Sequence, residues 1–397
     1  MQKHLFHHTN QLSNDPILQK SCTEFGFFDQ HDNEKIDLKN AWFSSPLGYK
    51  RHDIIDHVAE EMKNLKFDYA DGCMTSPSRQ KLANKLYDLS NGYYSVFGVS
   101  GSDAIETAVY ISHMYHNKKI VLSLDTSYHG ATMLTRGLGT STDIDTPSQN
   151  IVKVPNCEYQ KFGANAEKFF IKGLEHKIKS AGADNIACFV IETCSWRAGL
   201  YSYSNDLWQN IRAICDQNNI LLVVDDIAMC GGKTGRFFGI NLSVAQPDIV
   251  CLGKALTGGY FPLSATLISE KVFKKIQDQP FKYSYTYSAN ISGIESALKY
   301  IDILETENIL TQVSEQIVKY QKMLDEFKSQ GFITNHRNYG TVFSVDLPAT
   351  IDSSKLVEQG LFGQIDGNRI LMSFPIVPTD DFIDKIHTRL TNLFTTQ

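Results

Sequence analysis

Short apolar runs alternate with helix-like segments from about residue 56, and this alternation constrains the fold more than any other feature. Helical periodicity marks the segments 54–65, 78–90, 102–116, 163–181 and 205–218. Strand candidates lie at 94–99, 119–124, 187–192, 220–225, 249–252 and 263–268. They are mostly continuous runs rich in Val, Ile and Leu, which is typical of strands buried on both faces. The pattern predicts an α/β fold with a mostly parallel central sheet flanked by helices.

The last hundred or so residues follow a different pattern. A long helical stretch over about 291–330 precedes short strands near 341–346 and 369–373 and a terminal helix near 379–395. This predicts a small α+β domain that also contains the N-terminal segment. We expect its two parts at 1–55 and 291–397, with the large domain over 56–290, as the size of 397 residues also suggests.

Composition excludes several classes of protein. The formal net charge of −6 gives no basic surface for nucleic acid or an anionic membrane. The longest aliphatic runs are far shorter than the roughly 20 residues of a membrane helix, and no signal segment follows Met1. The 8 cysteines form no CxxC pair, so we expect no disulfide framework and no metal site. A reducing cytoplasm is the simplest location.

Ligand sites in open α/β sheets lie beyond the carboxyl ends of the strands. There, Ser100-Gly101-Ser102-Asp103 follows the strand 94–99 and begins a helix. Glycine permits close approach of the backbone, and the free N–H groups of a helix N-terminus favour a phosphate. The same residues also make a good helix cap, so both interpretations stay open.

Two charged residues follow two further strand candidates. Asp225 ends the apolar run that begins at Leu221, and a buried carboxylate needs a partner such as a protonated pyridine nitrogen. A helix cap or a metal ligand is the alternative. Lys254 lies between a strand and the pair Gly258-Gly259, where desolvation would lower its pKa and suit it to imine formation and proton transfer. The alternative is an exposed lysine at the start of a loop.

The fourth feature is Ser127-Tyr128-His129-Gly130, which follows the strand 119–124. A tyrosine on this loop could stack on a flat cofactor or pack in the core. The order of phosphate turn, aromatic residue, carboxylate and lysine resembles class III (ω-type) aminotransferases of pyridoxal 5′-phosphate (PLP) fold type I. The resemblance runs from about residue 40 to the C-terminus. It is closest in the branch of 7,8-diaminopelargonate synthase, the adenosylmethionine:8-amino-7-oxononanoate aminotransferase of biotin biosynthesis.

The segments Leu221–Gly235 and Asp248–Leu267 carry most of this resemblance. It implies a catalytic Lys254 that holds PLP as a Schiff base, with Asp225 at the pyridine nitrogen and Ile227 on the ring face. It also assigns the phosphate to Gly101 and Ser102 and the stacking aromatic ring to Tyr128. Thr286 would reach the phosphate of the neighbouring subunit of a homodimer, and Trp42 would line the substrate pocket.

The chain departs from the family pattern mainly where the substrate binds. The family's carboxylate-binding arginine would fall near Gly363-Gln364, and Arg369 stands several residues later, as a strand-edge charge. The family's E-P-I-x-x-G motif is Glu192-Thr-Cys-Ser-Trp196-Arg197-Ala-Gly199 here. We therefore treat Arg197 as a candidate anchor for a substrate carboxylate or phosphate, with a surface arginine as the alternative.

The resemblance predicts ping-pong transamination from a primary amine donor to a ketone or aldehyde acceptor. Lys254 would move the donor's α-proton, and Asp225 would keep the pyridine nitrogen protonated. An acceptor like 8-amino-7-oxononanoate is one candidate, and an aminotransferase of a specialised biosynthetic pathway is another. A PLP-dependent racemase, epimerase or decarboxylase, and a non-catalytic nucleotide-binding protein, are the competing functions.

Overall fold

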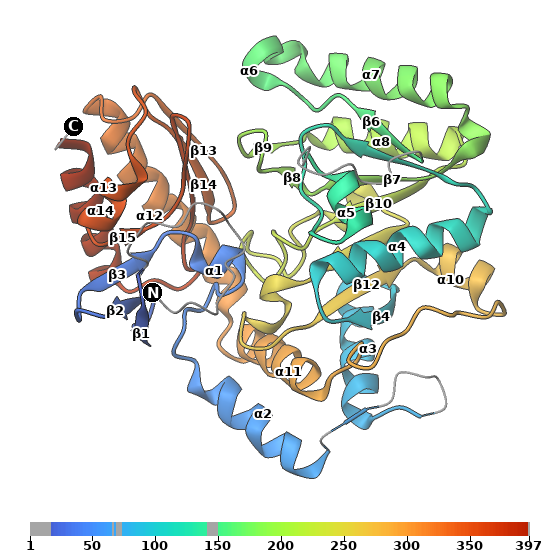
Figure 1. The fold of residues 1–397 in the computed structure, drawn as a ribbon, viewed down its shortest axis with the longest axis horizontal. Coiled ribbons are helices and arrows are strands. Elements are labelled where there is room, and N and C mark those ends of the chain that lie inside the picture. Colours follow the sequence, from blue (N-terminus) through green and yellow to red (C-terminus); the bar gives the residue numbers. More distant parts are fainter. Residues whose placement is uncertain (1–16, 66, 69–73, 141–149, 396–397) are drawn as a thin grey trace, which may run out of the picture.

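The protein is described here by a computed structural model that covers residues 17–65, 67–68, 74–140 and 150–395. Figure 1 shows two lobes, with the N- and C-terminal segments together in the smaller one. The larger lobe is built on a seven-stranded sheet in the order β4-β12-β11-β10-β7-β5-β6. The strands are β4 (Tyr94–Gly98), β5 (Ile120–Leu124), β6 (Ile151–Val154), β7 (Ile186–Glu192), β10 (Leu221–Asp225), β11 (Ile249–Leu252) and β12 (Ser264–Ile268).

The pairing in this sheet confirms the predicted α/β class. The neighbours from β11 to β6 pair in parallel, whereas β12 is antiparallel to both β11 and β4. All six strand candidates are strands, and β6 is one that the sequence interpretation missed. β6 is a short edge strand with only its last residue buried, so it lacks the apolar run that marks the others.

Helices cover both faces of the sheet because successive strand residues point to opposite sides. On one face, Val223 of β10 and Cys251 of β11 pack with α4 (Gly101–His116). On the other, alternate residues of the same strands pack with α7 (Ala166–Ala181) and α8 (Asn205–Gln217). The remaining helices and short strands of this lobe are α2 (His52–Asn64), α3 (Pro77–Ser90), α5 (Met133–Leu138), α6 (Tyr159–Phe162), α9 (Leu242–Ala245), α10 (Glu270–Ile276), β8 (Cys194–Ser195) and β9 (Tyr201–Ser202).

The predicted long helix over 291–330 is wrong in one respect. The chain forms α11 (Ile291–Thr306) and α12 (Ile309–Ser329), separated at Asn308, whose φ of 51° is left-handed. Asn tolerates this conformation better than most residues, so it can end one helix and start another in a new direction. The buried side chains of α11 belong to the core of the large lobe, and most of those of α12 pack in the small lobe.

The small lobe joins the two ends of the chain around its own core. One sheet has the order β1-β2-β3-β15 and the other β13-β14-β17-β16. Helices α12 and α14 pack against each other here, and their buried side chains share one core with Phe343 and Ile370 of the second sheet. The elements are β1 (Gln19–Cys22), β2 (Gly26–Asp29), β3 (Glu34–Asp37), β13 (Asn335–Tyr339), β14 (Val342–Asp346), β15 (Leu361–Phe362), β16 (Ile365–Asp366), β17 (Arg369–Ser373), α13 (Ser353–Glu358) and α14 (Asp380–Thr395).

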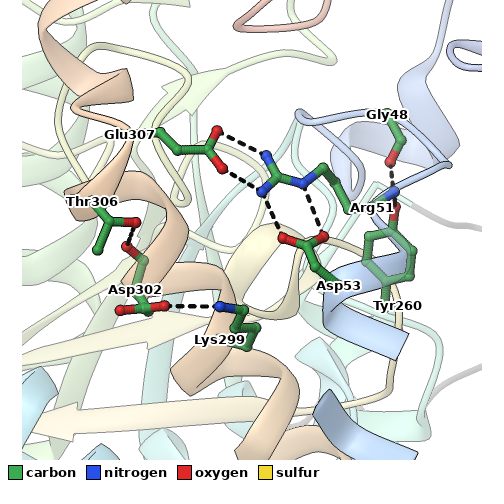
Figure 2. A network of polar contacts seen from close by, with 8 residues as sticks. All are labelled: Gly48, Arg51, Asp53, Tyr260, Lys299, Asp302, Thr306 and Glu307. Atoms are coloured by element: carbon green, nitrogen blue, oxygen red, sulfur yellow. Dashed lines mark hydrogen bonds and ion pairs between the residues drawn. The ribbon is translucent and has the colours of Figure 1, made fainter. Parts of the chain in front are cut away.

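Arg51 lies where the chain leaves the small lobe and enters α2, and it ties this crossing to two other segments (Figure 2). Its guanidinium bonds Glu307 just beyond α11, at 3.0 Å for Nη1–Oε2, and Asp53, at 2.7 Å for Nη2–Oδ2. Its backbone N–H donates to the Tyr260 hydroxyl, which in turn donates to the Gly48 carbonyl. Tyr260 follows the pair Gly258-Gly259, so the network connects the start of α2 to the segment after Lys254.

Within the ranges given above, none of the helices has the length and apolar character needed to cross a membrane. The same residues contain no group of three or more His, Cys, Asp or Glu side chains that could hold a metal ion.

Candidate active site

A capping box fixes the conformation of the turn after β4. The Ser100 hydroxyl accepts from the Asp103 N–H at 3.3 Å, and the Asp103 carboxylate accepts from the Ser100 N–H at 2.8 Å. These bonds leave the N–H groups of Gly101 and Ser102 at the start of α4 available for a ligand. The 16-residue helix adds a partial positive charge at this end, so the turn suits a phosphate.

Glycine residues allow this turn to pack closely against two neighbouring loops. A Cβ atom on Gly101 would lie 3.0 Å from Ile227 Cδ1, and one on Gly253 would lie 3.2 Å from Ile227 Cγ2. A Cβ atom on Gly130, whose φ is +134°, would lie 2.2 Å from the Ser102 hydroxyl oxygen. That hydroxyl also accepts the Ala131 N–H at 3.1 Å, so Ser102 fixes the loop that carries Tyr128.

Asp225 ends β10 with a side chain that is 7% exposed. Its Oδ2 atom lies 2.8 Å from His129 Nδ1, and its Oδ1 atom accepts the Ile227 N–H at 3.1 Å. The bond to the carboxylate places a proton on Nδ1 of His129, since the carboxylate has none to give. The two bonds hold Asp225 as an oriented, negatively charged acceptor at the cavity.

Lys254 follows β11 and begins a short 3₁₀ turn, with a left-handed backbone φ of 44°. Such a conformation is costly for lysine and is seen where the surrounding structure enforces it. Burial lowers the pKa of Lys254, and the charge of Asp225 opposes that shift. Its Nζ atom lies 5.1 Å from the centre of the Phe43 ring, which covers the lysine from the small-lobe side.

Phe43 and Trp42 belong to α1 (Asn40–Phe43), a turn whose four residues all have left-handed φ values of 48° to 70°. Asp37 holds its start by accepting the N–H groups of Lys39 and Ala41, each at 2.8 Å. The turn buries Phe43 beside Lys254 and leaves Trp42 47% exposed. Trp42, which the resemblance leads us to expect in the substrate pocket, is therefore presented by a strained backbone segment.

Two cavities meet at Lys254. The inner one, of about 170 Å³, is lined by the phosphate turn, Tyr128, His129, Glu192, Asp225 and Ile227. The outer one, of about 770 Å³, is lined by Trp42, Phe43, Arg197 and Arg369. Lys254, Tyr128 and Trp196 line both cavities, so the two cavities adjoin at these residues.

Arg197 lies above the aromatic pair at this boundary. Its guanidinium carbon is 5.3 Å from the ring centres of both Tyr128 and Trp196. Arg369 packs against the same loop, because a Cβ atom on Gly199 would lie 3.2 Å from its guanidinium carbon. Arg369 shares Asp346 with Arg337, which already bonds both oxygens of that carboxylate.

The structure thus brings together eight of the nine residues singled out from the sequence. Gly101, Ser102, Tyr128, Asp225, Ile227 and Lys254 line the inner cavity, and Trp42 and Arg197 line the outer one. Thr286 is exposed and lines neither cavity of this single chain.

Sequence reasoning assigned no role to His129, Phe43 or Glu192 and placed Arg369 at a strand edge. His129 follows Tyr128 in the loop Ser127–Gly130, which the sequence had singled out for Tyr128. This position in the loop was the available sequence signal for its contact with Asp225.

Comparison with known proteins decides the family. The sequence matches the class-III aminotransferases over residues 15–394, which is nearly the whole chain. The chain belongs to this family. Class III aminotransferases depend on PLP, and the protein is accordingly a PLP-dependent transaminase of fold type I.

Individual relatives differ in what they act on. A taurine–pyruvate aminotransferase of Bilophila wadsworthia is 29% identical over 381 residues, covering 89% of this chain and 81% of its own. An adenosylmethionine-8-amino-7-oxononanoate aminotransferase of Methanocaldococcus jannaschii is 23% identical, covering 89% and 87%. A PLP-bound aminotransferase structure from Vibrio fluvialis superposes with a TM-score of 0.92 at 20% identity, covering 99% and 96%.

Proposed function

We propose that this transaminase moves an amino group from a primary amine to a ketone or aldehyde by a ping-pong reaction at Lys254. The observation that carries the proposal is that Lys254, Asp225 and the phosphate turn line one cavity of about 170 Å³. Each follows its own strand, so their side chains converge at one edge of the sheet.

The residues present fit PLP at both of its charged ends. Gly101 and Ser102 would hold the phosphate, Asp225 would pair with the pyridine nitrogen, and Ile227 and Tyr128 would lie against the ring. When bound, PLP supplies an electron sink for the bonds around the substrate's amino carbon. Lys254, whose pKa is lowered by burial, would bind the cofactor and then carry the proton of that carbon.

The outer cavity favours a substrate with an acidic group. Lys39, Arg197 and Arg369 line it, with Asp366 as the opposing charge. Within the described residues, no carboxylate pairs with Arg197, and Arg369 is 3.6 Å from an aspartate that Arg337 already binds. These arginines stand in place of the arginine that the family carries near Gly363, and Trp42 would flank the substrate chain.

Acidic substrates also agree with the relatives. Taurine and pyruvate carry a sulfonate and a carboxylate, and 8-amino-7-oxononanoate carries a carboxylate. The presence of Arg197 in place of the family's small or amide residues favours an acidic substrate. The missing arginine near Gly363 supports an aminotransferase of a specialised biosynthetic pathway. An 8-amino-7-oxononanoate-like acceptor is the second candidate, supported by the resemblance of the lysine segment.

We further propose that the working form is a homodimer in which Thr286 completes the neighbouring site. Large apolar side chains are exposed on the single chain, including Trp42 (47%) at the outer cavity, Met133 (52%) and Tyr287 (64%), the neighbour of Thr286. A second copy that covers Tyr287 would also contact the segment around Thr286.

The test is a half-reaction with an amine donor alone. The holoenzyme would be mixed with taurine, glutamate, alanine, lysine, adenosylmethionine or a terminal diamine, and the absorbance of PLP followed. Conversion to pyridoxamine phosphate without acceptor supports transamination. A racemase or decarboxylase would turn over with the PLP band retained, and that result would refute the proposal. Arg197→Ala should raise the KM for acidic donors and leave diamines unaffected.

A further inference from the structure

Glu192 is a buried carboxyl group beside the cofactor site that the proposed function leaves without a role. It ends β7 and is the register neighbour of Asp225 in the parallel pair β7–β10. The residue is 4% exposed and lines the inner cavity with Lys254. Among the described residues, neither of its oxygens makes a hydrogen bond of good geometry, although the Tyr128 backbone N–H lies close enough to stabilise a charge on it. A buried polar group without a partner is costly, which points to a ligand that completes the site.

The surroundings of Glu192 favour its protonated form. Burial and the neighbouring charge of Asp225 raise the pKa of Glu192 well above its ordinary value. The backbone N–H of Tyr128 and the charges of Lys254 and Arg197 act in the opposite direction. A neutral carboxyl group donates one hydrogen bond, unlike a carboxylate.

The polar atoms of PLP can be matched one by one with the side chains of the inner cavity. Asp225 fits the pyridine nitrogen and the phosphate turn fits the phosphate, which leaves the phenolic oxygen of the ring. The Thr193 hydroxyl already donates a hydrogen bond to Asp226, at 2.6 Å, and the Ala228 side chain has no polar group. His129 is already engaged with the Asp225 carboxylate through Nδ1, at 2.8 Å.

The geometry points to Glu192, the unpaired register neighbour of Asp225 in the inner cavity: we propose that its protonated carboxyl group donates a hydrogen bond to the phenolic oxygen of PLP. This inference rests on the proposed function, since it requires PLP at Lys254. A donor at the phenolic oxygen stabilises the negative charge there. That charge otherwise attracts the proton of the Schiff base, so the donor lowers the pKa of the Schiff base.

The experiment is a spectroscopic pH titration of the Schiff base in the holoenzyme and its variants. Glu192→Ala should raise the Schiff-base pKa by about one unit or more, since a hydrogen bond to a charged group is lost. It should also weaken PLP binding by roughly tenfold. Glu192→Gln keeps a neutral donor and should titrate within a few tenths of the original protein.

The opposite shift would overturn the inference, because loss of an ionised carboxylate lowers the Schiff-base pKa. An unchanged pKa in Glu192→Ala would overturn it as well. Glu295→Gln is a matched control: Glu295 is also 4% exposed, but it pairs with His57 at 3.0 Å and lines neither cavity. An original protein without any Schiff-base band would instead refute the proposed function itself.

Discussion

Replacement of Asp225 by asparagine removes one charge from the site and keeps its shape. The amide can still bond the Ile227 N–H and remain close to His129, which Asp225 contacts at 3.1 and 2.8 Å. What is lost is the charge that would hold the pyridine nitrogen in its protonated form. A hydrogen bond to a charged group contributes about 1.5–3 kcal/mol, and a residue only 7% exposed has little water to replace it.

At 1.36 kcal/mol per tenfold change, Asp225→Asn should slow the amine half-reaction by roughly 10- to 150-fold. The Asp225 charge also raises the pKa of Lys254, so the variant should lower that pKa further. Stopped-flow absorbance of PLP with one amine donor gives the rate at saturating donor, separately from donor binding.

Asp226→Asn is the matched control for this experiment. Asp226 is the next residue, yet it does not line the inner cavity and accepts hydrogen bonds from Thr193, Gly239 and Ile240. Asp226→Asn should affect stability far more than the half-reaction rate. The reasoning is refuted if Asp225→Asn reacts within threefold of the original rate, or if the two variants are equally slow.

Three further predictions concern the same site. Gly130→Ala would place a Cβ atom 2.2 Å from the Ser102 hydroxyl, on a residue whose φ is +134°. The variant should therefore bind PLP at least tenfold more weakly in a fluorescence titration, and unchanged affinity would contradict the tight contact. Burial raises the pKa of Asp226 to about 7, so the stability it contributes is complete below its unfolded pKa near 4 and is lost as the pH rises through 7. Denaturant unfolding should therefore show the original protein losing stability relative to Asp226→Asn between pH 4 and 8, and a constant difference would refute the assignment. Subunits carrying Lys254→Ala mixed with subunits carrying Thr286→Ala should regain activity if Thr286 acts across a dimer interface, whereas inactive mixed dimers would contradict that role.

Local patterns predicted the sheet and placed Gly101, Tyr128, Asp225 and Lys254 at the ends of its strands, whereas the other candidate residues came from the family resemblance. The strands are apolar runs, and these four candidates end or follow them, so their convergence comes from the parallel sheet itself. β6 was missed because its one buried residue leaves no apolar run. The break at Asn308 was missed because a single left-handed residue hardly disturbs helical periodicity.

The residues without a predicted role depend on contacts between distant segments. His129 gains its role from Asp225, 96 positions later in the chain. Phe43 covers Lys254 only because the turn Asn40–Phe43 is left-handed, a conformation that no residue type in it requires. Arg369 lines the outer cavity because β17 and the loop at Gly199 pack together across the two lobes. A local sequence pattern does not show which of these distant segments come into contact.

The central claim is that Lys254 holds the cofactor, and borohydride reduction of the holoenzyme tests it most directly. Reduction followed by peptide mass spectrometry should place the pyridoxyl group on Lys254 alone. Lys233 is a demanding internal comparison, because it is fully buried nearby and burial lowers its pKa to about 8. A pyridoxyl group on Lys233, or a protein with no reducible PLP, would contradict the account.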